Sequence, residues 1–248
     1  MAPEISLIMT TYNVEKHLDS AFYSLANQKN YDLEKLEVIA VDDKSTDGSV
    51  EKVRESIKKY DSLNIKLIEL SKNSGRPAIP RNVAINNSSG DYVLRFDSDD
   101  MLHPLCLEEV TSAFKQNPKV GFIYTDHMQV SPPAKIPLRE EDIIQRKTKP
   151  SFNLRKYLEG DYNFVAALNA VRREDCVLFD EEVKFSEDAD WIIRIALNKV
   201  RFHHIQKPLY FWRKGIDSLT TRTNREDRIY WHDVVFQRGL KTLNERKK

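Results

Sequence analysis

Hydrophobic positions in the first 130 residues fall alternately into short β-branched runs and stretches with helical spacing. The β-branched runs predict strands at 5–10, 37–41, 65–70, 92–96 and 120–124. Apolar residues recurring at threes and fours predict helices at 17–28, from about 47 to 60, from about 80 to 87 and at 104–116. Alternation of this kind predicts an α/β fold with a mostly parallel central sheet flanked by helices.

The second half of the chain has a less regular pattern. Residues 131–151 carry three prolines in their first seven positions, which predicts an exposed crossover or lid; a flexible loop without function is the alternative. Beyond this segment the pattern predicts helices at 154–159, 188–197 and 226–243, and strands at 166–171, 202–205 and 209–212.

Polar clusters follow the first, second and fourth predicted strands. Because ligands of open α/β sheets bind beyond the carboxyl ends of the strands, these clusters are predicted to converge on one site. In the cluster Asp97-Ser98-Asp99-Asp100, three carboxylates repel one another unless a cation neutralises them. Oxygen ligands of this type suit Mg²⁺ or Mn²⁺, and the alternative is a solvated acidic turn.

Other candidate residues each allow a functional and a structural interpretation. Tyr12 either stacks on a base or is simply packed, and Asp43 either binds a ligand or belongs to a capping loop. Arg81 either clamps a phosphate or is a surface arginine at a helix start. Asp188, after a candidate N-cap at Ser186, is either a general base or an acidic residue favoured by the helix dipole.

Glycine content excludes two familiar phosphate-binding loops. The chain of 248 residues has 7 glycines, and the closest pair is Gly75 and Gly90. The sequence therefore contains neither the dinucleotide-binding motif G-x-G-x-x-G nor the P-loop motif. Any phosphate must be bound by side chains or metal, in what is by composition an ordinary globular protein with 40% hydrophobic and 31% charged residues.

A net charge of +1 conceals an uneven distribution. Residues 201–248 carry 12 Lys and Arg against 5 Asp and Glu, together with several aromatic residues. This basic segment either binds an anionic acceptor or an acidic membrane surface, or is a solvated helix that packs one face on the domain. No nucleic-acid reader motif accompanies it, so nucleic-acid binding is not expected.

Cysteine usage and the absence of apolar spans indicate a cytoplasmic protein. Cys106 and Cys176 lie far apart in apolar surroundings, which predicts two buried thiols in a reducing compartment. The N-terminus has no basic signal-like region, and no window approaches the roughly 20 apolar residues of a membrane span. Binding of the basic segment to lipid would place the protein at the inner face of the membrane.

Taken together, five strings resemble the family-2 glycosyltransferases with a GT-A fold, in the order and spacing of that family. They are Ile-Met-Thr-Thr-Tyr-Asn (8–13), Val-Asp-Asp-Lys-Ser-Thr-Asp-Gly-Ser (41–49), Pro-Arg-Asn-Val-Ala-Ile (80–85), Gly-Asp-Tyr-Val-Leu-Arg-Phe-Asp-Ser-Asp-Asp (90–100) and Glu-Asp-Ala-Asp-Trp (187–191). Asn73-Ser74-Gly75 before Pro80-Arg81-Asn82 is more loosely similar to bacterial enzymes that glycosylate wall teichoic acid.

The resemblance implies one GT-A domain over residues 1–248. Residues 1–130 would form the nucleotide-sugar-binding half, 131–215 the acceptor-binding half and 216–248 a basic C-terminal helical segment. The implied donor-site residues are Thr10, Tyr12, Asp43, Arg81, Asp97, Ser98 and Asp99. Among these, Thr10, Tyr12 and Asp43 would hold a uracil base, and Arg81 would approach the phosphates. The implied ligands of Mn²⁺ or Mg²⁺ are Asp97, Asp99 and Asp100.

The implied reaction is an inverting, metal-dependent transfer from a UDP-sugar to a hydroxyl of a bacterial glycan, polyol-phosphate or lipid-linked acceptor. The enzyme would be a hexosyl- or N-acetylhexosaminyltransferase. Asp188 would be the base, and Glu187 would orient the acceptor or tune Asp188. The alternatives are a non-catalytic glycosyltransferase-like binding module and a Mg²⁺-dependent phosphohydrolase, against which Asp100 argues because that class has Thr or Val there.

Two positions depart from the family pattern. Lys44 follows the paired aspartates where the family usually has glycine. Gly215 occupies the position of a histidine that many relatives carry after Trp212-Arg213-Lys214. If that histidine contacts the metal or the diphosphate in the relatives, His203, His204 or Lys214 would have to replace it in this chain.

Overall fold

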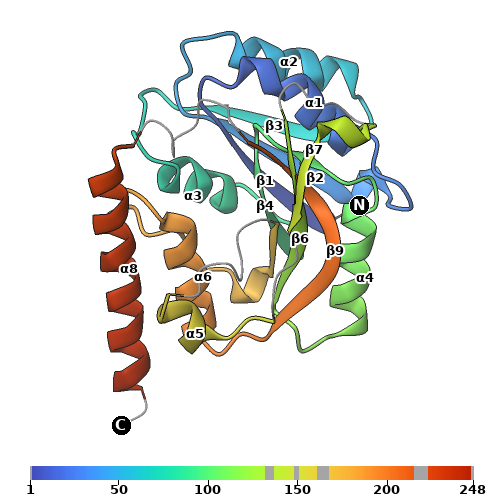
Figure 1. Cartoon of the computed structure of the whole chain (residues 1–248). Coiled ribbons are helices and arrows are strands. Elements are labelled where there is room, and N and C mark those ends of the chain that lie inside the picture. The colour runs from blue at the N-terminus through green and yellow to red at the C-terminus, as the bar shows by residue number, and fades with distance from the viewer. Residues whose placement is uncertain (1, 132–136, 148–150, 161–167, 215–222, 247–248) are drawn as a thin grey trace.

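A nine-stranded sheet organises the protein, in the order β3-β2-β1-β4-β8-β6-β9-β5, with β7 paired to β6 (Figure 1). The computed structural model describes residues 2–131, 137–147, 151–160, 168–214 and 223–246. The strands are β1 (Ile5–Thr11), β2 (Leu36–Asp42), β3 (Asn64–Glu69), β4 (Tyr92–Asp97), β5 (Met101–Leu102), β6 (Phe122–Val130), β7 (Ile143–Lys147), β8 (Asn169–Arg172) and β9 (Phe202–Arg213).

Helices cover both faces of this sheet. The α-helices are α1 (Glu15–Ala26), α2 (Ser49–Lys59), α3 (Ala78–Asn86), α4 (Cys106–Gln116), α5 (Leu154–Leu158), α6 (Glu187–Leu197) and α8 (Arg225–Glu245). Short 3-10 turns lie at Leu33–Lys35, Glu140–Asp142 and Arg173–Asp175. The amphipathic pattern thus predicted the main helices correctly. Figure 1 shows α8 as a long helix along one side of the molecule.

Strand directions confirm the expected mostly parallel sheet. β3, β2, β1 and β4 are parallel neighbours. β8 is antiparallel to both β4 and β6, so β6 and its parallel partner β9 run in the same direction as β4. The short strands β5 and β7 pair antiparallel at the β9 and β6 side. The first half is therefore a parallel α/β layer, whose strands end at one edge.

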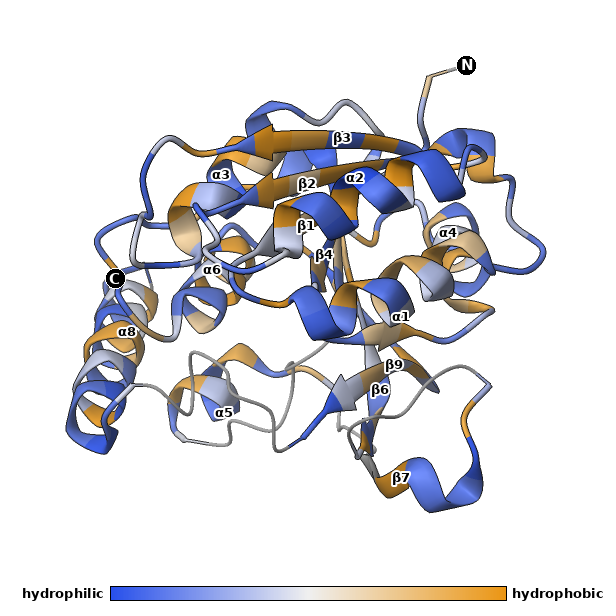
Figure 2. Ribbon diagram, turned by 90° about the horizontal axis from the view of Figure 1, so that it is seen from above, coloured by the Kyte–Doolittle hydropathy of each residue, from blue (hydrophilic) through white to orange (hydrophobic). Residues whose placement is uncertain are grey.

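Side-chain alternation along the strands divides the core into two layers. In β1, Leu7 and Met9 pack with α1, α2 and α4, whereas Ile8 packs with α3, α5, α6 and α8. This alternation is the period-2 geometry of a strand that is buried on both faces. In Figure 2 the hydrophobic colour follows β2 between the helices, and α1 and α2 carry hydrophilic colour on their outer turns.

The structure corrects several sequence predictions. β9 is one strand where two were predicted. Pro208 does not interrupt it, because the register with β6 shifts at this proline and a bulge tolerates its missing N–H. β7 lies inside the predicted loop 131–151 and pairs with an extended β6. Cys106 is buried as expected, but Cys176 is only partly buried. Positions 166–167 and Gly215 lie outside the described residues.

The basic C-terminal segment folds as the predicted helix. The side chain of Asn224 caps α8 by accepting a hydrogen bond from the backbone N–H of Asp227 at 2.7 Å. Val235, Phe236 and Gly239 are buried against the body of the protein, while most other α8 residues face solvent to different degrees. In the part of the chain that the structure describes, no helix has the length and apolar character needed to cross a bilayer.

A buried carboxylate ties together the beginnings of β1, β2 and β4. Glu37 of β2 accepts hydrogen bonds from the Ser6 hydroxyl at 2.5 Å and from the backbone N–H groups of Ser89 at 2.5 Å and Gly90 at 3.0 Å. The backbones come so close that a Cβ on Gly90 would lie 2.8 Å from the Ser6 nitrogen. Burial by itself raises the pKa of Glu37, but these hydrogen bonds outweigh it and hold the pKa below its ordinary value.

We expect Glu37→Gln to lower the free energy of unfolding at pH 7 by about 1–3 kcal/mol, because buried donors lose an ionised acceptor. A depressed carboxyl pKa stabilises the protein above the unfolded-state pKa, and this contribution disappears as the pH falls through the folded-state pKa. The variant should therefore lose less stability than wild type below about pH 4.5 in urea unfolding series. Exposed Glu34→Gln is the control, and equal stability and equal acid dependence in Glu37→Gln would contradict the assignment.

Candidate functional site

The polar ends of β1, β2 and β4 meet at one edge of the sheet, as the sequence predicted. β1 lies between the other two strands, so their carboxyl ends are neighbours. The Ser98 hydroxyl donates to the Thr10 carbonyl oxygen at 2.7 Å, and the Thr11 hydroxyl donates to Asp42 at 2.9 Å. Ser98 therefore joins two strands, and its hydroxyl proton is already used within the protein.

Asp43 and Tyr12 lie at the ends of β2 and β1. The two carboxylate oxygens of buried Asp43 accept hydrogen bonds from the Ser74 backbone N–H at 2.7 Å and the Ser74 hydroxyl at 2.8 Å. Each oxygen keeps a second acceptor position. Burial raises the pKa of Asp43, against the effect of Ser74, and Asp42 adds to the rise. The Tyr12 side chain is 40% exposed, so its ring is available to a ligand.

The loop after β2 is fixed by Asp42 and contains a strained lysine. Asp42 accepts from the Ser45 backbone N–H at 2.9 Å and from the Ser45 hydroxyl at 2.6 Å. Lys44 between them has φ of 63°, in the left-handed region that glycine occupies without strain. The chain thus keeps the conformation of the usual glycine at this position, at a cost of about 1–2 kcal/mol for a side-chain-bearing residue.

Asp97 is held by two arginines at the end of β4. Its carboxylate accepts from Arg95 at 3.2 Å and from Arg81 at 3.0 Å. Burial raises the pKa of Asp97, but Arg95 and then Arg81 outweigh burial and hold this pKa below its ordinary value. Asp97 therefore stays ionised and fixed in orientation.

Asp99 differs from its neighbours because no other described residue donates a hydrogen bond to its carboxylate. Burial and the nearby charge of Asp97 raise the pKa of Asp99 to about 6. A carboxylate in these surroundings gains most from a cation, since a cation relieves both the desolvation and the repulsion.

Asp100 is bound to β9. Its two oxygens accept from the Tyr210 hydroxyl at 2.7 Å and the Arg213 backbone N–H at 2.8 Å, and Arg213 Nε also donates to the Asp99 carbonyl at 2.8 Å. Burial, then Asp99 and Asp97, raise the pKa of Asp100 well above its ordinary value. Among the described residues, no three acidic, imidazole or thiol groups converge as a metal cluster. Both carboxylate oxygens of Asp100 are thus bonded to β9, and the three-aspartate ligand set stays a prediction.

The N-terminus of α6 is joined to this turn by Arg81. One guanidinium nitrogen donates to Glu187 at 2.5 Å, the other donates to Asp97 at 3.0 Å, and the guanidinium lies 5.3 Å from the centre of the Phe179 ring. Burial raises the pKa of Glu187, Arg81 opposes the rise and Asp188 adds to it. Arg81 is thus not the surface arginine of the second alternative, since it is buried between two carboxylates of the candidate site, and its contact with a phosphate stays a prediction.

Asp188 follows Glu187 and is only partly buried. One of its oxygens accepts from the Ala189 backbone N–H at 2.8 Å. Ser186 does not cap the helix through its side chain, contrary to the sequence prediction. Its backbone has φ of 61° and ψ of 28°, whereas a capping serine needs an extended backbone to reach the first amides. A strained residue immediately before two carboxylates is typical of functional sites.

The sequence interpretation missed Arg95. This residue is buried in β4, and its Nε donates to Asn169 of β8 at 3.2 Å. Burial lowers the pKa of Arg95, but Asp97 and then Asp188 outweigh it and raise the pKa. The sequence did contain a signal for Arg95. It is an arginine inside an otherwise apolar strand, and it lies two positions before Asp97 and so on the same strand face.

Comparison with known proteins relates the chain to sugar transferases. The family model described as glycosyl transferase family 2 matches residues 6–177. Poly(ribitol-phosphate) beta-N-acetylglucosaminyltransferase TarS of Staphylococcus aureus (strain Mu50) is 27% identical over 250 residues, covering 97% of this chain and 41% of that relative. Poly(ribitol-phosphate) beta-glucosyltransferase of Bacillus spizizenii is 42% identical over 99 residues, or 40% of this chain and 15% of that relative.

Solved structures show the same fold. The S. aureus TarS 1-349 complex with UDP-GlcNAc has a TM-score of 0.74 at 25% identity, over 95% of this chain and 65% of that one. The mannosyltransferase PcManGT from Pyrobaculum calidifontis, in complex with GDP-Man and Mn2+, has a TM-score of 0.63 at 18% identity, over 99% of this chain and 76% of that one. The chain has the GT-A fold, and it spans about two fifths of the TarS relative.

We expect Asp99→Asn to stabilise the metal-free protein at pH 7. A raised carboxyl pKa means that folding stability falls as the pH rises from the unfolded-state value near 3.9 to the folded-state value near 6. Removing the charge should recover roughly 1 kcal/mol or more at pH 7 and flatten the pH dependence between these values. Chemical unfolding at pH 4–7 measures both effects.

Exposed Asp61→Asn is the matched control for this experiment. If Asp99→Asn instead destabilises the metal-free protein at pH 7, the carboxylate has a stabilising partner and the cation interpretation loses its basis.

Proposed function

The chain belongs to glycosyl transferase family 2, and from this membership we propose an inverting, metal-dependent transfer of a sugar from a UDP-sugar to an acceptor hydroxyl. The observation that carries the proposal is the link that buried Arg81 makes between the turn of Asp99, whose carboxylate no other described residue bonds, and the start of α6, where Asp188 is partly exposed. The first carboxylate suits a cation at the donor diphosphate, and the second suits a base for the acceptor.

Tyr12, Thr10 and Asp43 would hold the donor base. The exposed Tyr12 ring offers a stacking surface, and Asp43 keeps acceptor positions for the uracil N–H after its two bonds to Ser74. Support comes from the TarS structures, which are complexes with UDP and UDP-GlcNAc. The Ser98 hydroxyl, bound to the Thr10 carbonyl, would shape this site rather than donate to the ribose.

The charges of the site leave room for a divalent cation. The carboxylates of the site are Asp97, Asp99, Asp100, Glu187 and Asp188, and the guanidiniums facing them are Arg81, Arg95 and Arg213. Formally, two negative charges remain. Mg²⁺ is usually held by one or two carboxylates together with substrate phosphates, so Asp99 with Asp97 is a sufficient protein ligand set. When bound, Mg²⁺ or Mn²⁺ would act as a Lewis acid that neutralises the leaving diphosphate.

Asp188 would supply the base. Its carboxylate takes the proton of the acceptor hydroxyl as the acceptor oxygen bonds to the anomeric carbon, and the bond from that carbon to the UDP oxygen breaks on the opposite side. Attack opposite the leaving group inverts the anomeric configuration. Glu187, paired to Arg81, would fix the start of α6 so that Asp188 stays beside the donor.

Arg81 would act in two ways. It uses one N–H for Glu187 and one for Asp97, and a guanidinium has five N–H donors. The remaining donors can approach the donor phosphates without giving up these two bonds. Arg81 would therefore position the base helix relative to the diphosphate.

The relatives support a polyol-phosphate acceptor and leave glucosyl and N-acetylglucosaminyl transfer as the first donors to test. A glycan or lipid-linked acceptor would use the same hydroxyl chemistry. We place the reaction in the cytoplasm. The basic residues of 201–248 would bring it to the inner face of the membrane, where anionic lipids attract Lys and Arg.

A donor screen with a base variant tests the reaction. The purified chain is incubated with UDP-glucose, UDP-galactose, UDP-GlcNAc or UDP-GalNAc, Mn²⁺ and a poly(ribitol-phosphate) acceptor, and UDP release and acceptor mass are measured. Asp188→Asn should lower transfer about 10²–10⁴-fold while UDP affinity stays near wild type, because a general base contributes to the chemical step. Asp61→Asn should match wild type.

Turnover of no donor, with or without acceptor and metal, would refute the transferase proposal. UDP release without acceptor modification would identify a hydrolase instead. Loss of UDP binding in Asp188→Asn would move this residue from the base position to the donor site.

Asp99→Ala and Asp100→Asn should separate metal binding from positioning. In calorimetric titrations with UDP, Mn²⁺ should tighten binding to wild type by about tenfold or more, and Asp99→Ala should remove this gain. Asp100→Asn should lower the melting temperature, because it weakens the bonds to Tyr210 and Arg213, and should keep a Mn²⁺-dependent gain. The reverse pattern would make Asp100, not Asp99, the metal ligand.

A further inference from the structure

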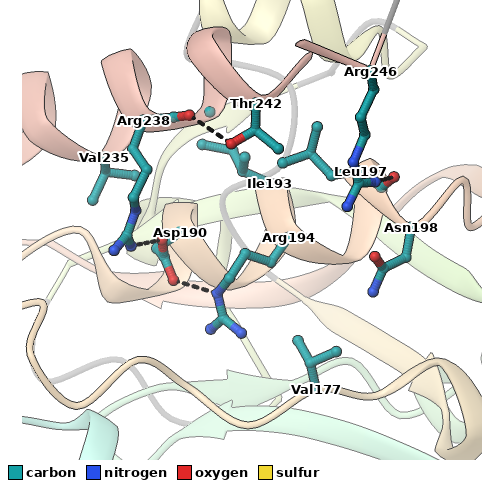
Figure 3. A pocket seen from close by; sticks show the side chains of 11 residues that line it. Val177, Asp190, Ile193, Arg194, Leu197, Asn198, Val235, Arg238, Thr242 and Arg246 are labelled. Atoms are coloured by element: carbon teal, nitrogen blue, oxygen red, sulfur yellow. Dashed lines mark hydrogen bonds and ion pairs between the residues drawn. The ribbon is translucent and has the colours of Figure 1, made fainter.

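A pocket of about 350 Å³ lies between α6 and α8, beyond the first turn of α6 (Figure 3). Its apolar walls come from Ile193 and Leu197 of α6, Val235 of α8 and Val177 of the segment below α6. The volume is at the lower end of the roughly 300–1,000 Å³ of small-molecule sites. The candidate transfer site does not use any of these residues.

Three arginines and one carboxylate give this pocket its charge. Arg194, Arg238 and Arg246 line it together with Asp190 (Figure 3). Asp190 is already used, since it accepts from Arg194 Nε at 2.6 Å and also from Arg238. The other Arg238 nitrogen donates to Asp180 at 2.8 Å. Counting both aspartates, the group keeps an excess of positive charge.

One of these arginines has a buried donor without a partner in the described part of the chain. Arg194 Nη2 is buried and has no hydrogen-bond partner in the described part of the chain. Arg246 is exposed at the rim of the pocket, where it donates one N–H to the carbonyl of Leu197, at the end of α6, and keeps further donors for a ligand. Buried donors are almost always satisfied in proteins, so an unsatisfied guanidinium nitrogen at a cationic pocket indicates an acceptor supplied by a ligand.

We propose that this pocket binds a phosphate monoester on a small carbon skeleton, such as a polyol phosphate, free or at the end of a polymer. Guanidinium groups bind phosphate through paired, charge-assisted hydrogen bonds, and a phosphate monoester offers them three acceptor oxygens where a carboxylate offers two. The apolar walls would cover the carbon skeleton. Because the ligand would bridge α6 and α8, its binding should stabilise the packing of α8 against the helix that carries Asp188.

Titration of the full chain with three probes tests the proposal. Inorganic phosphate, glycerol 3-phosphate and uncharged glycerol are compared by calorimetry and thermal unfolding, with and without saturating UDP. Glycerol 3-phosphate should bind most tightly and raise the melting temperature, and glycerol should have no effect. A preformed polymer with only internal phosphodiesters should bind more weakly than one with a terminal monoester.

Variants locate the binding. The double variant Arg194→Gln/Arg246→Gln should lower the affinity for glycerol 3-phosphate by about tenfold or more, since charge-assisted hydrogen bonds are lost. Lys241→Gln, on an exposed position of α8 outside the lining, is the matched control, and Asp99→Ala should also bind normally. If the double variant is misfolded by circular dichroism, Arg194→Lys, which keeps the charge but not the fork, replaces it and should bind at an intermediate level.

Equal affinity in wild type and a folded double variant would overturn the proposal, as would a wild-type Kd weaker than about 10 mM. Displacement of glycerol 3-phosphate by UDP would also overturn it, because it would place the ligand in the donor site. Equal binding of inorganic phosphate would refute the contribution of the apolar walls. The outcome does not depend on the proposed transfer, since a chain that turns over no UDP-sugar can still bind a phosphate here.

Discussion

Neutralisation of clustered carboxylates by buried arginines is the interaction on which the candidate site depends. Arg81 comes from α3, Arg95 from β4 and Arg213 from β9, and each contacts a group of the Asp97–Asp100 turn. Removing one arginine would leave buried carboxylates without a partner, which typically costs several kcal/mol. The arginines therefore fix three separate elements around one short acidic turn.

Neutralisation by arginines also gives the three aspartates of the turn different surroundings. Asp97 is paired with arginines, Asp100 is bonded to β9, and Asp99 remains without a donor from another described residue. Equal carboxylates, adjacent in sequence, thus acquire different protonation behaviour from their surroundings alone. The two bound aspartates hold the backbone so that the third presents a charge that no donor of another described residue satisfies.

The sequence was sufficient to predict the parallel first half of the sheet, the main helices and the convergence of the polar strand ends. Those features depend on local periodicity and on the rule that parallel strands end together. The partners of the acidic residues could not be predicted in the same way. Asp100 meets Tyr210 across 110 positions and Arg81 meets Glu187 across 106, and no local pattern encodes such distances. The pocket between α6 and α8 likewise arises from helix packing.

The attachment of the acidic turn to β9 has a consequence for the order in which the molecule matures. All of the aspartates of the turn are synthesised 110 or more residues before Tyr210 and Arg213, a delay of roughly 6–20 s at typical translation rates. During that interval the parallel half of the sheet can form, but its acidic turn lacks its anchor. Closing so long a loop late in folding is slow, because its entropic cost precedes its contacts. A nascent chain therefore carries the complete acidic motif well before it carries an organised site.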